Sequence, residues 1–302
     1  MGLIELFLNN LLPVLLAVGA GYLAARYLKV DPRSLSRVTF YIFSPALIFT
    51  LLTQSELSNG DILKMAAFAA GVVFLVGGIA WIAGRLFRLE RRTLAAVVIT
   101  SMFLNAGNFG LAVVNFGFGE TALAYASVFF VTNAILVYTV GVLIASLGKA
   151  SFSRSLLNLA KVPAIYAMGL AFLFMYTGWQ LPIPLERTTG LLGDAAIAAM
   201  LVLLGLQLYS VSWAGNILPL ALSSVVRLLV SPAIAIGLSV LLSIGDPFRQ
   251  AAVLQSAMPT AVLTTVLATE YDVHPRFVTS VVFITTLLSM FTLTPLLAYL
   301  GG

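Results

Sequence analysis

Apolar stretches of bilayer-crossing length follow one another along nearly the whole chain. A membrane-spanning helix needs about 20 predominantly apolar residues, and the 302-residue sequence divides into ten such segments joined by short polar connections. Only 9% of its residues are charged, whereas a soluble domain carries about 25%. The sequence excludes a soluble or disordered chain and predicts an all-α integral membrane protein. The predicted spans are residues 3–27, 34–54, 62–87, 93–117, 121–147, 155–177, 188–211, 215–243, 248–271 and 275–300.

The residue types that are missing exclude several kinds of chemistry. The chain has no cysteine and one histidine, His274, so it cannot build a thiolate zinc site, an iron–sulfur cluster or a multi-histidine metal site. It has no phosphate-binding loop of the type Gly-x-x-x-x-Gly-Lys-Ser/Thr, which argues against direct use of ATP. We therefore expect no enzyme, no metal and no cofactor. The net charge is +5, but the basic residues lie in the connections between the predicted spans, so nucleic acid is not an expected partner.

The distribution of basic residues predicts the orientation in the membrane. Twelve of the sixteen Lys and Arg residues fall in loops on one side of the predicted spans, three fall on the other side, and Arg227 lies within a span. Because short cytoplasmic loops are enriched in Lys and Arg, the sequence predicts a cell-membrane protein with both termini outside the cytoplasm and the loop near Lys149–Arg154 inside it.

An odd number of spans in each half makes the two halves run in opposite directions. Residues 1–150 and 151–302 would each hold five spans, and inverted repeats of this kind are common among secondary transporters. The fourth span of each half is the one that polar residues or proline interrupt. The sequence therefore predicts two inverted five-helix repeats with broken, crossing helices at spans four and nine.

Span four contains two amides and two glycines at mid-membrane depth: Asn105, Gly107, Asn108 and Gly110. Unpaired polar groups cost several kcal/mol in hydrocarbon, so these residues must face protein or water. Glycine permits unwinding, and asparagine supplies donors and acceptors. Close helix packing with asparagine as interhelical glue is the alternative interpretation.

Span nine contains a mid-helix proline, Pro259. Proline removes one helical hydrogen bond and frees carbonyls near Gln255 and Ser256, while the amides that follow, near Thr260, would point into the break. A simple kink is the alternative. The matching repeat positions of the two interruptions favour discontinuous helices that meet near Ala106–Asn108 and Met258–Thr260.

These interrupted segments resemble the auxin efflux carrier family. Residues 105–111 (Asn-Ala-Gly-Asn-Phe-Gly-Leu) with 116–120 look like its span-four signature, and residues 258–262 (Met-Pro-Thr-Ala-Val) with 269–271 look like its span-nine signature. This chain departs from the common pattern at Ala112, where members often have Pro, and at Leu263, where they often have Asn. Weaker agreement lies at residues 45–49, 227–232 and 285–289.

The resemblance implies a fold like that of the sodium–bile acid symporters. Spans 1, 2, 6 and 7 would form a scaffold, and spans 3–5 and 8–10 would form a transport domain that moves in an elevator-type, alternating-access cycle. It also implies a homodimer through the scaffold, within the lipid bilayer. Plant members export indole-3-acetate, and bacterial members are linked to malate, malonate or similar carboxylates. The sequence thus indicates a secondary transporter of a small organic anion.

Within that scheme, six polar residues are candidates for binding the substrate: Asn105 and Asn108 of span four, Gln255 and Thr260 of span nine, and Ser44 and Asn133 elsewhere. Gly107, Gly110 and Pro259 are the candidates for the helix breaks. For Arg227 a packing role and a substrate contact remain open, and for Asp194 a coupling role and a helix-dipole role remain open.

Other functions stay open at this stage. A channel is disfavoured because channels line a pore with rings of groups from several subunits. A sodium-coupled symporter of the bile acid type could use amide and carbonyl oxygens, but no acidic residue lies near the predicted break. A non-transporting sensor on the same fold is the remaining alternative.

Overall fold

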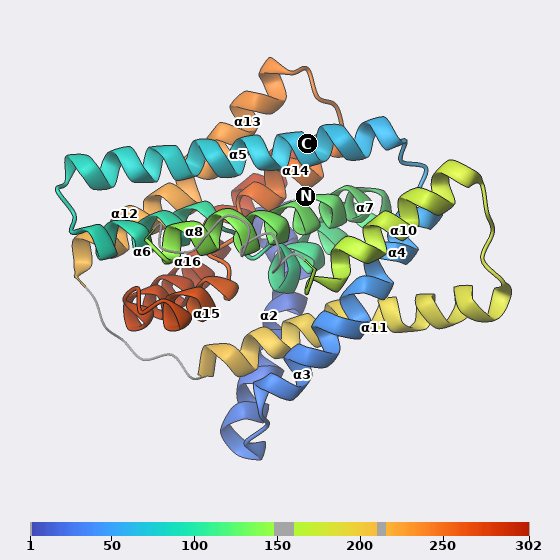
Figure 1. The fold of residues 1–302 in the computed structure, drawn as a ribbon, viewed down its shortest axis with the longest axis horizontal. Helices are drawn as coiled ribbons and strands as arrows, with labels where there is room; N and C mark the ends of the chain where they lie inside the picture. The colour runs from blue at the N-terminus through green and yellow to red at the C-terminus, as the bar shows by residue number, and fades with distance from the viewer. Residues whose placement is uncertain (1, 148–159, 210–215, 302) are drawn as a thin grey trace.

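The computed structural model is helical and describes residues 2–147, 160–209 and 216–301 (Figure 1). Within these ranges, the one β-type pairing is an isolated antiparallel bridge between Leu104 and Thr260. Seven helical segments of the described residues are long and apolar enough to cross a membrane: Leu3–Leu28, Pro32–Gln54, Asn59–Leu86, Ala106–Ala145, Ile183–Tyr209, Ile217–Leu241 and Pro275–Gly301.

Four of these segments contain one or two π-helical turns and so carry more than one label. The N-terminal half is built from α1 (Leu3–Leu6), η1 (Phe7–Leu11), α2 (Leu12–Leu23), η2 (Ala24–Leu28), α3 (Pro32–Val38), η3 (Thr39–Phe43), α4 (Ser44–Gln54), α5 (Asn59–Leu86), α6 (Arg91–Met102), η4 (Ala106–Leu111), α7 (Ala112–Leu136), η5 (Val137–Gly141) and α8 (Val142–Ala145). The C-terminal half is built from α10 (Pro163–Thr177), α11 (Ile183–Tyr209), α12 (Ile217–Val225), η6 (Val226–Val230), α13 (Ser231–Leu241), α14 (Phe248–Ser256), α15 (Leu263–Glu270) and α16 (Pro275–Gly301).

Polar side chains at the loop ends set where these helices begin. Ser58 and Asp61 form a reciprocal capping box at the start of α5. Asp31 accepts a hydrogen bond from the backbone amide of Arg33 before α3, and Asn216 caps α12 in the same manner. These caps are local signals in the sequence, which is why the predicted boundaries of the long spans lie close to the observed ones.

Two predicted spans are not single long helices. Residues 93–117 divide into α6, a non-helical stretch at Phe103–Asn105, and η4 with the start of α7. Residues 248–271 divide into α14 and α15, which are too short to cross a bilayer separately. Within the described residues, length and composition therefore identify seven spans where the sequence predicted ten, and α10 is an apolar helix shorter than these seven. The start of the predicted span 155–177 and the loop near Lys149–Arg154 lie outside the described residues.

The boundary between the predicted spans 93–117 and 121–147 lies at Gly119. This residue has φ +76° and interrupts the helical conformation inside α7. A left-handed backbone angle of this kind is accessible to glycine at little cost. The segment Ala106–Ala145 therefore consists of two helices joined at a bend, as the predicted boundary requires.

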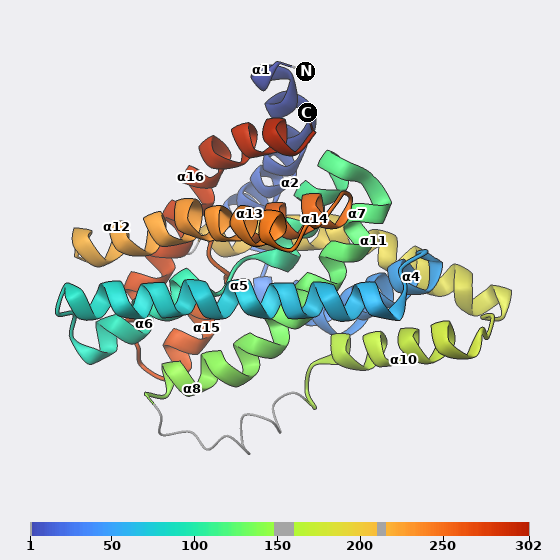
Figure 2. The ribbon, with the colours of Figure 1, turned by 90° about the horizontal axis from the view of Figure 1, so that it is seen from above.

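The helices pack in two groups. In the first group, α11 packs on α2 and α4, and α4 packs on α10. In the second group, α5 packs on α6, α7 and α13, which in turn contact α12 and α14. Figure 2 shows α5 running between α13 and α6. Both views place the two chain ends near each other, and α1 contacts α16.

Backbone contact between α2 and α11 depends on two glycines. A Cβ atom on Gly205 would lie 1.9 Å from the Val18 carbonyl oxygen, and one on Gly21 would lie 2.1 Å from the Val202 carbonyl oxygen. Gly205 and the buried Ala196 are therefore used inside the chain.

Three connections that the sequence places on the cytoplasmic side meet in the structure. Arg92 pairs with Asp272 at 3.5 Å, Thr93 lies 3.4 Å from the His274 ring, and Arg91 donates to the Leu147 carbonyl at 2.8 Å. The start of α6, the end of α8 and the α15–α16 connection are thus neighbours.

Candidate functional site

The two interrupted segments cross each other and pair through their backbones. The backbone N–H of Asn105 donates to the Pro259 carbonyl at 2.8 Å, and the backbone N–H of Ala261 donates to the Phe103 carbonyl at 3.0 Å. This pairing satisfies polar groups that the broken helices would otherwise leave bare at membrane depth. The break in the first segment lies at Phe103–Asn105, a few residues before the expected Ala106–Asn108, because residue 106 already begins a helical turn.

The glycines of this segment serve packing rather than unwinding. Gly107 and Gly110 both lie within the helical turn η4. A Cβ atom on Gly107 would lie 2.7 Å from the Phe130 ring, and one on Gly110 would lie 2.3 Å from the Gln255 side-chain oxygen. Gly107 and Gly110 therefore allow close packing, which was the alternative interpretation of the sequence.

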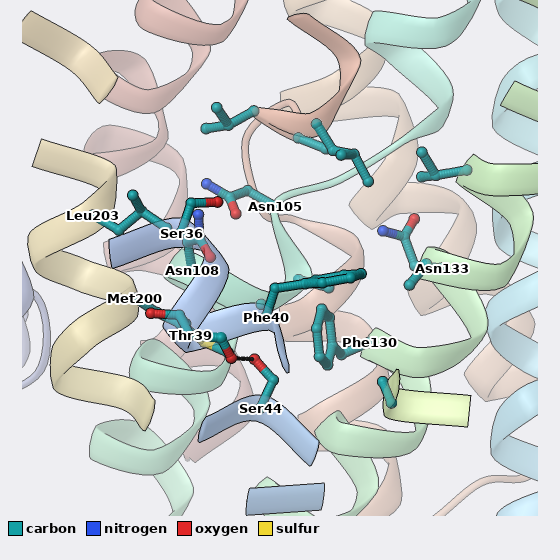
Figure 3. Close-up of a pocket in the computed structure, with 18 of the residues that line it drawn as sticks. Ser36, Thr39, Phe40, Ser44, Asn105, Asn108, Phe130, Asn133, Met200 and Leu203 are labelled. Carbon is teal, nitrogen blue, oxygen red and sulfur yellow. Dashed lines mark hydrogen bonds between the residues drawn. The ribbon is translucent and has the colours of Figure 1, made fainter. Parts of the chain in front are cut away.

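A cavity of about 160 Å³ lies beside the crossing, between the two groups of helices (Figure 3). One side is formed by α3, η3, α4, the start of α10 and α11, and the other by η4, α7, η5, the residues before α15 and the first turn of α15. Figure 3 shows the side chains of Asn105 and Asn108 toward Ser36, with Asn133 on the far side of Phe40. Of the six candidate residues, Asn105, Asn108, Asn133 and Ser44 line this cavity.

Three buried polar atoms at the cavity have no hydrogen-bond partner in the structure: Nδ2 of Asn105, Oδ1 of Asn133 and Oγ1 of Thr39. Both asparagines are 5% exposed. Asn133 uses its Nδ2 to donate to the Leu104 carbonyl at 3.1 Å, which fixes its Oδ1 as the open acceptor. An unsatisfied buried polar atom costs about 1–3 kcal/mol, and three at one cavity indicate a site built for a polar ligand.

The electrostatic character of the cavity comes from helix ends. The residues that line it include no Asp, Glu, Lys, Arg or His among the described part of the chain. The first turn of η4, which continues into α7, and the first residues of α15 lie at its wall. Because the N-terminal end of a helix carries partial positive charge, the cavity offers an anion a positive potential without a fixed charge.

The structure does not bring Gln255 or Thr260 to this cavity. Nε2 of Gln255 donates to the carbonyls of Ala106 and Ala126, at 3.2 and 3.4 Å, behind η4. The Thr260 hydroxyl donates to the Thr100 carbonyl at 2.7 Å, and its amide donates to the Thr285 hydroxyl. Both residues stabilise the crossing of the two segments. The prediction that they line the substrate site is therefore wrong for this cavity.

Comparison with known proteins decides the family. The sequence profile of a family described as "Membrane transport protein" matches residues 6–297, nearly the entire chain. The chain belongs to this family. The resemblance to auxin efflux carriers that the interrupted segments suggested is confirmed, because those carriers are among the matching relatives.

Two relatives agree with this chain over most of their length, and an auxin efflux carrier agrees over a smaller part. An uncharacterized transporter of Methanothermobacter thermautotrophicus is 31% identical over 94% of this chain and 95% of its own. A putative malonate transporter of Rhizobium meliloti is 27% identical over 95% of this chain and 93% of its own. Auxin efflux carrier component 3a of Oryza sativa subsp. japonica is 27% identical over 44% of this chain and 22% of its own. The relatives are transporters and not enzymes.

Two charged residues of the transporter lie away from the cavity. Arg227 is fully buried where α6 and α14 end, and Asp194 is exposed on α11, three turns from its start. Position 194 is therefore too deep in its helix for the expected first-turn role. Neither side chain reaches the cavity lining.

Sequence reasoning missed the contribution of the α3–η3 segment and of α11. Thr39, Phe40 and Ser36 come from the first, and Met200 and Leu203 come from the second. Thr39 offered a signal, since it is a polar residue inside an apolar span five residues before Ser44, whose hydroxyl donates to the Thr39 carbonyl at 2.8 Å. The apolar members have the pattern of ordinary core residues.

Proposed function

We propose that the chain is a secondary carrier that binds a small carboxylate in the cavity beside the crossing. The observation that carries the proposal is the unpartnered, buried Asn105 Nδ2 beside two helix N-termini in an uncharged cavity. Neutral donors and helix dipoles hold an anion moderately and let it leave. A carrier needs both properties, because conduction requires binding that is weak enough for release.

Two features of the cavity favour a small dicarboxylate or hydroxy acid over an auxin. A cavity of about 160 Å³ is comparable to an engineered cavity that holds benzene, which suits a small ligand such as malonate or malate better than the two-ring indole-3-acetate. The open acceptor Oδ1 of Asn133, across Phe40 from Asn105, matches a donor at the far end of the ligand. The hydroxyl of malate or the proton of a half-neutralised malonate supplies such a donor.

The proposed architecture is two inverted five-span repeats, residues 1–150 and 151–302. The two packing groups support a scaffold of spans 1, 2, 6 and 7 and a transport domain of spans 3–5 and 8–10. Because the cavity lies between the groups, relative movement would carry the ligand across, which is an elevator-type cycle. We propose that the protein lies in the cell membrane with both termini outside the cytoplasm, because of the distribution of its basic residues. We also propose that two copies form a homodimer through the scaffold.

A thermal-shift series on purified protein tests the proposed ligand. We expect malonate and malate to raise the unfolding midpoint in a saturable manner, because a ligand that binds only the folded state stabilises it by mass action. Malonamide, a neutral analogue of similar size, is the control and is expected to have no effect. Uptake of radiolabelled malonate into proteoliposomes then tests transport. A protein that no carboxylate stabilises would overturn the proposal.

A further inference from the structure

Arg227 is a fully buried cation whose partners are helix ends. Its Nη1 donates to the carbonyls of Ser101 at 2.8 Å and Met102 at 3.3 Å, and its Nη2 donates to the Ser256 carbonyl and the Ser231 hydroxyl. The same hydroxyl also donates to the Ser256 carbonyl at 2.7 Å. In the described part of the chain, no carboxylate forms an ion pair with Arg227.

The carbonyls that Arg227 binds belong to the two helices that end at the crossing. Helix α6 ends at Met102 and α14 ends at Ser256. The last carbonyls of a helix lack partners within it and together carry about −0.5 elementary charge. Two such ends add to about −1, which matches the charge of one guanidinium. The helix ends therefore serve as the counter-ion of Arg227.

The opposite pair of helix ends lies at the cavity. There η4 and α15 begin, and their first amides carry about +0.5 elementary charge each. The crossing is therefore polarised, with the positive ends toward the ligand and the negative ends toward Arg227. Without a cation at the negative ends, their field would oppose the binding of an anion nearby, because charges interact strongly in a medium of low dielectric constant.

We propose that Arg227 is a tethered cation that neutralises the negative helix ends of the crossing, so that anion binding in the cavity needs no bound metal cation. The inference rests on the proposed function for the identity of the ligand. The role of the Arg227 charge at the crossing is argued independently of the proposed function. The surrounding groups are carbonyl and hydroxyl oxygens, which are the ligands of hard cations such as sodium. The guanidinium occupies that environment permanently, and Arg227 is a positioning residue because it does not line the cavity.

The unmodified protein provides the first test. We expect the affinity for malonate, measured by isothermal titration calorimetry, to agree within about twofold between sodium chloride and N-methyl-D-glucamine chloride at equal ionic strength. A drop of tenfold or more on removal of sodium would overturn the inference. An absence of malonate binding in both salts would refute the proposed ligand and leave the next test to decide on Arg227.

Substitution of the cation provides a test that needs no substrate. Arg227→Ala is expected to lower the unfolding midpoint, and millimolar guanidinium chloride is expected to raise it again in a saturable manner by entering the vacated place. The control Arg187→Ala removes an exposed arginine and is expected to show no recovery with guanidinium. An Arg227→Ala protein that is as stable as the parent, or one that guanidinium does not restore, would contradict the role of the charge.

Two further variants separate charge from shape. Arg227→Lys keeps the positive charge, whereas Arg227→Met keeps a long stem without it. If malonate binds the parent, we expect Arg227→Lys to bind it within about tenfold of the parent and Arg227→Met to bind it at least tenfold more weakly than Arg227→Lys, and we expect sodium to improve only the binding of Arg227→Met. A folded Arg227→Met protein with the affinity of the parent would overturn the proposal.

Discussion

Replacing Asn105 with aspartate is expected to abolish carboxylate binding at neutral pH. The substitution removes the open Nδ2 donor and places a negative charge at the wall of the cavity. A lost hydrogen bond to a charged group is worth about 1.5–3 kcal/mol, and repulsion between two unit charges at about 4 Å adds about 4 kcal/mol at an effective dielectric constant of 20. Together these come to about 5.5–7 kcal/mol, so the expected loss of affinity is about ten-thousandfold or more.

The measurement is calorimetric titration with malonate, and two further variants interpret it. Asn105→Ala removes the donor without adding a charge and is expected to lose about tenfold or more. Asn59→Asp makes the same chemical change at the exposed start of α5 and is expected to bind as the parent does. Equal affinity in Asn105→Asp and the parent would place the anion elsewhere.

Replacing Gly205 with alanine is expected to prevent most of the protein molecules from folding correctly. The new Cβ would lie 1.9 Å from the Val18 carbonyl oxygen and 2.6 Å from the Tyr22 amide nitrogen, both of which are backbone atoms of α2. Overpacking against side chains costs about 1–3 kcal/mol, and two helix backbones yield less readily than a side chain does. The separation of α2 from α11 must therefore increase along their whole contact.

A second glycine of α11 supplies the control for this substitution. A Cβ atom on Gly190 would meet no atom within 4 Å, and Gly→Ala in a helix is stabilising by about 1 kcal/mol. The yield of monodisperse protein and the unfolding midpoint are the measurements. We expect a large fall in both for Gly205→Ala and none for Gly190→Ala. Equal behaviour of the two variants would contradict the close approach of α2 and α11.

The long helices and the positions of the two interruptions could be predicted from the sequence. Apolar stretches of bilayer length identify α5, α11 and α16, and caps such as Ser58 mark where a helix begins. Pro259 and the polar residues of span four identify the broken segments, because proline and unpaired amides are costly inside a membrane helix. These signals are local, so no tertiary information is needed to read them.

The sequence does not predict which polar residues face the cavity and which ones pack within the crossing. Gln255 and Asn105 are both amides near an interruption, yet only Asn105 faces the cavity, while Gln255 packs against Gly110. Phe40 and Met200 line the cavity but have the pattern of core residues. Which side of the crossing a residue faces depends on how the two broken segments pair, and that pairing joins residues about 155 positions apart, such as Leu104 and Thr260.

Protection of a single introduced cysteine tests the location of the anion most directly. Val262 lines the cavity, is half-buried and has no proposed polar role, and the chain has no native cysteine. Malonate is expected to slow the maleimide labelling of Val262→Cys in a saturable manner, and malonamide is expected to leave the rate unchanged. Gly60→Cys, which is exposed at the start of α5, is the control and is expected to react at the same rate with and without malonate. Labelling of Val262→Cys that saturating malonate does not slow, in a protein that binds malonate, would contradict the central claim that the carboxylate occupies the cavity beside the crossing.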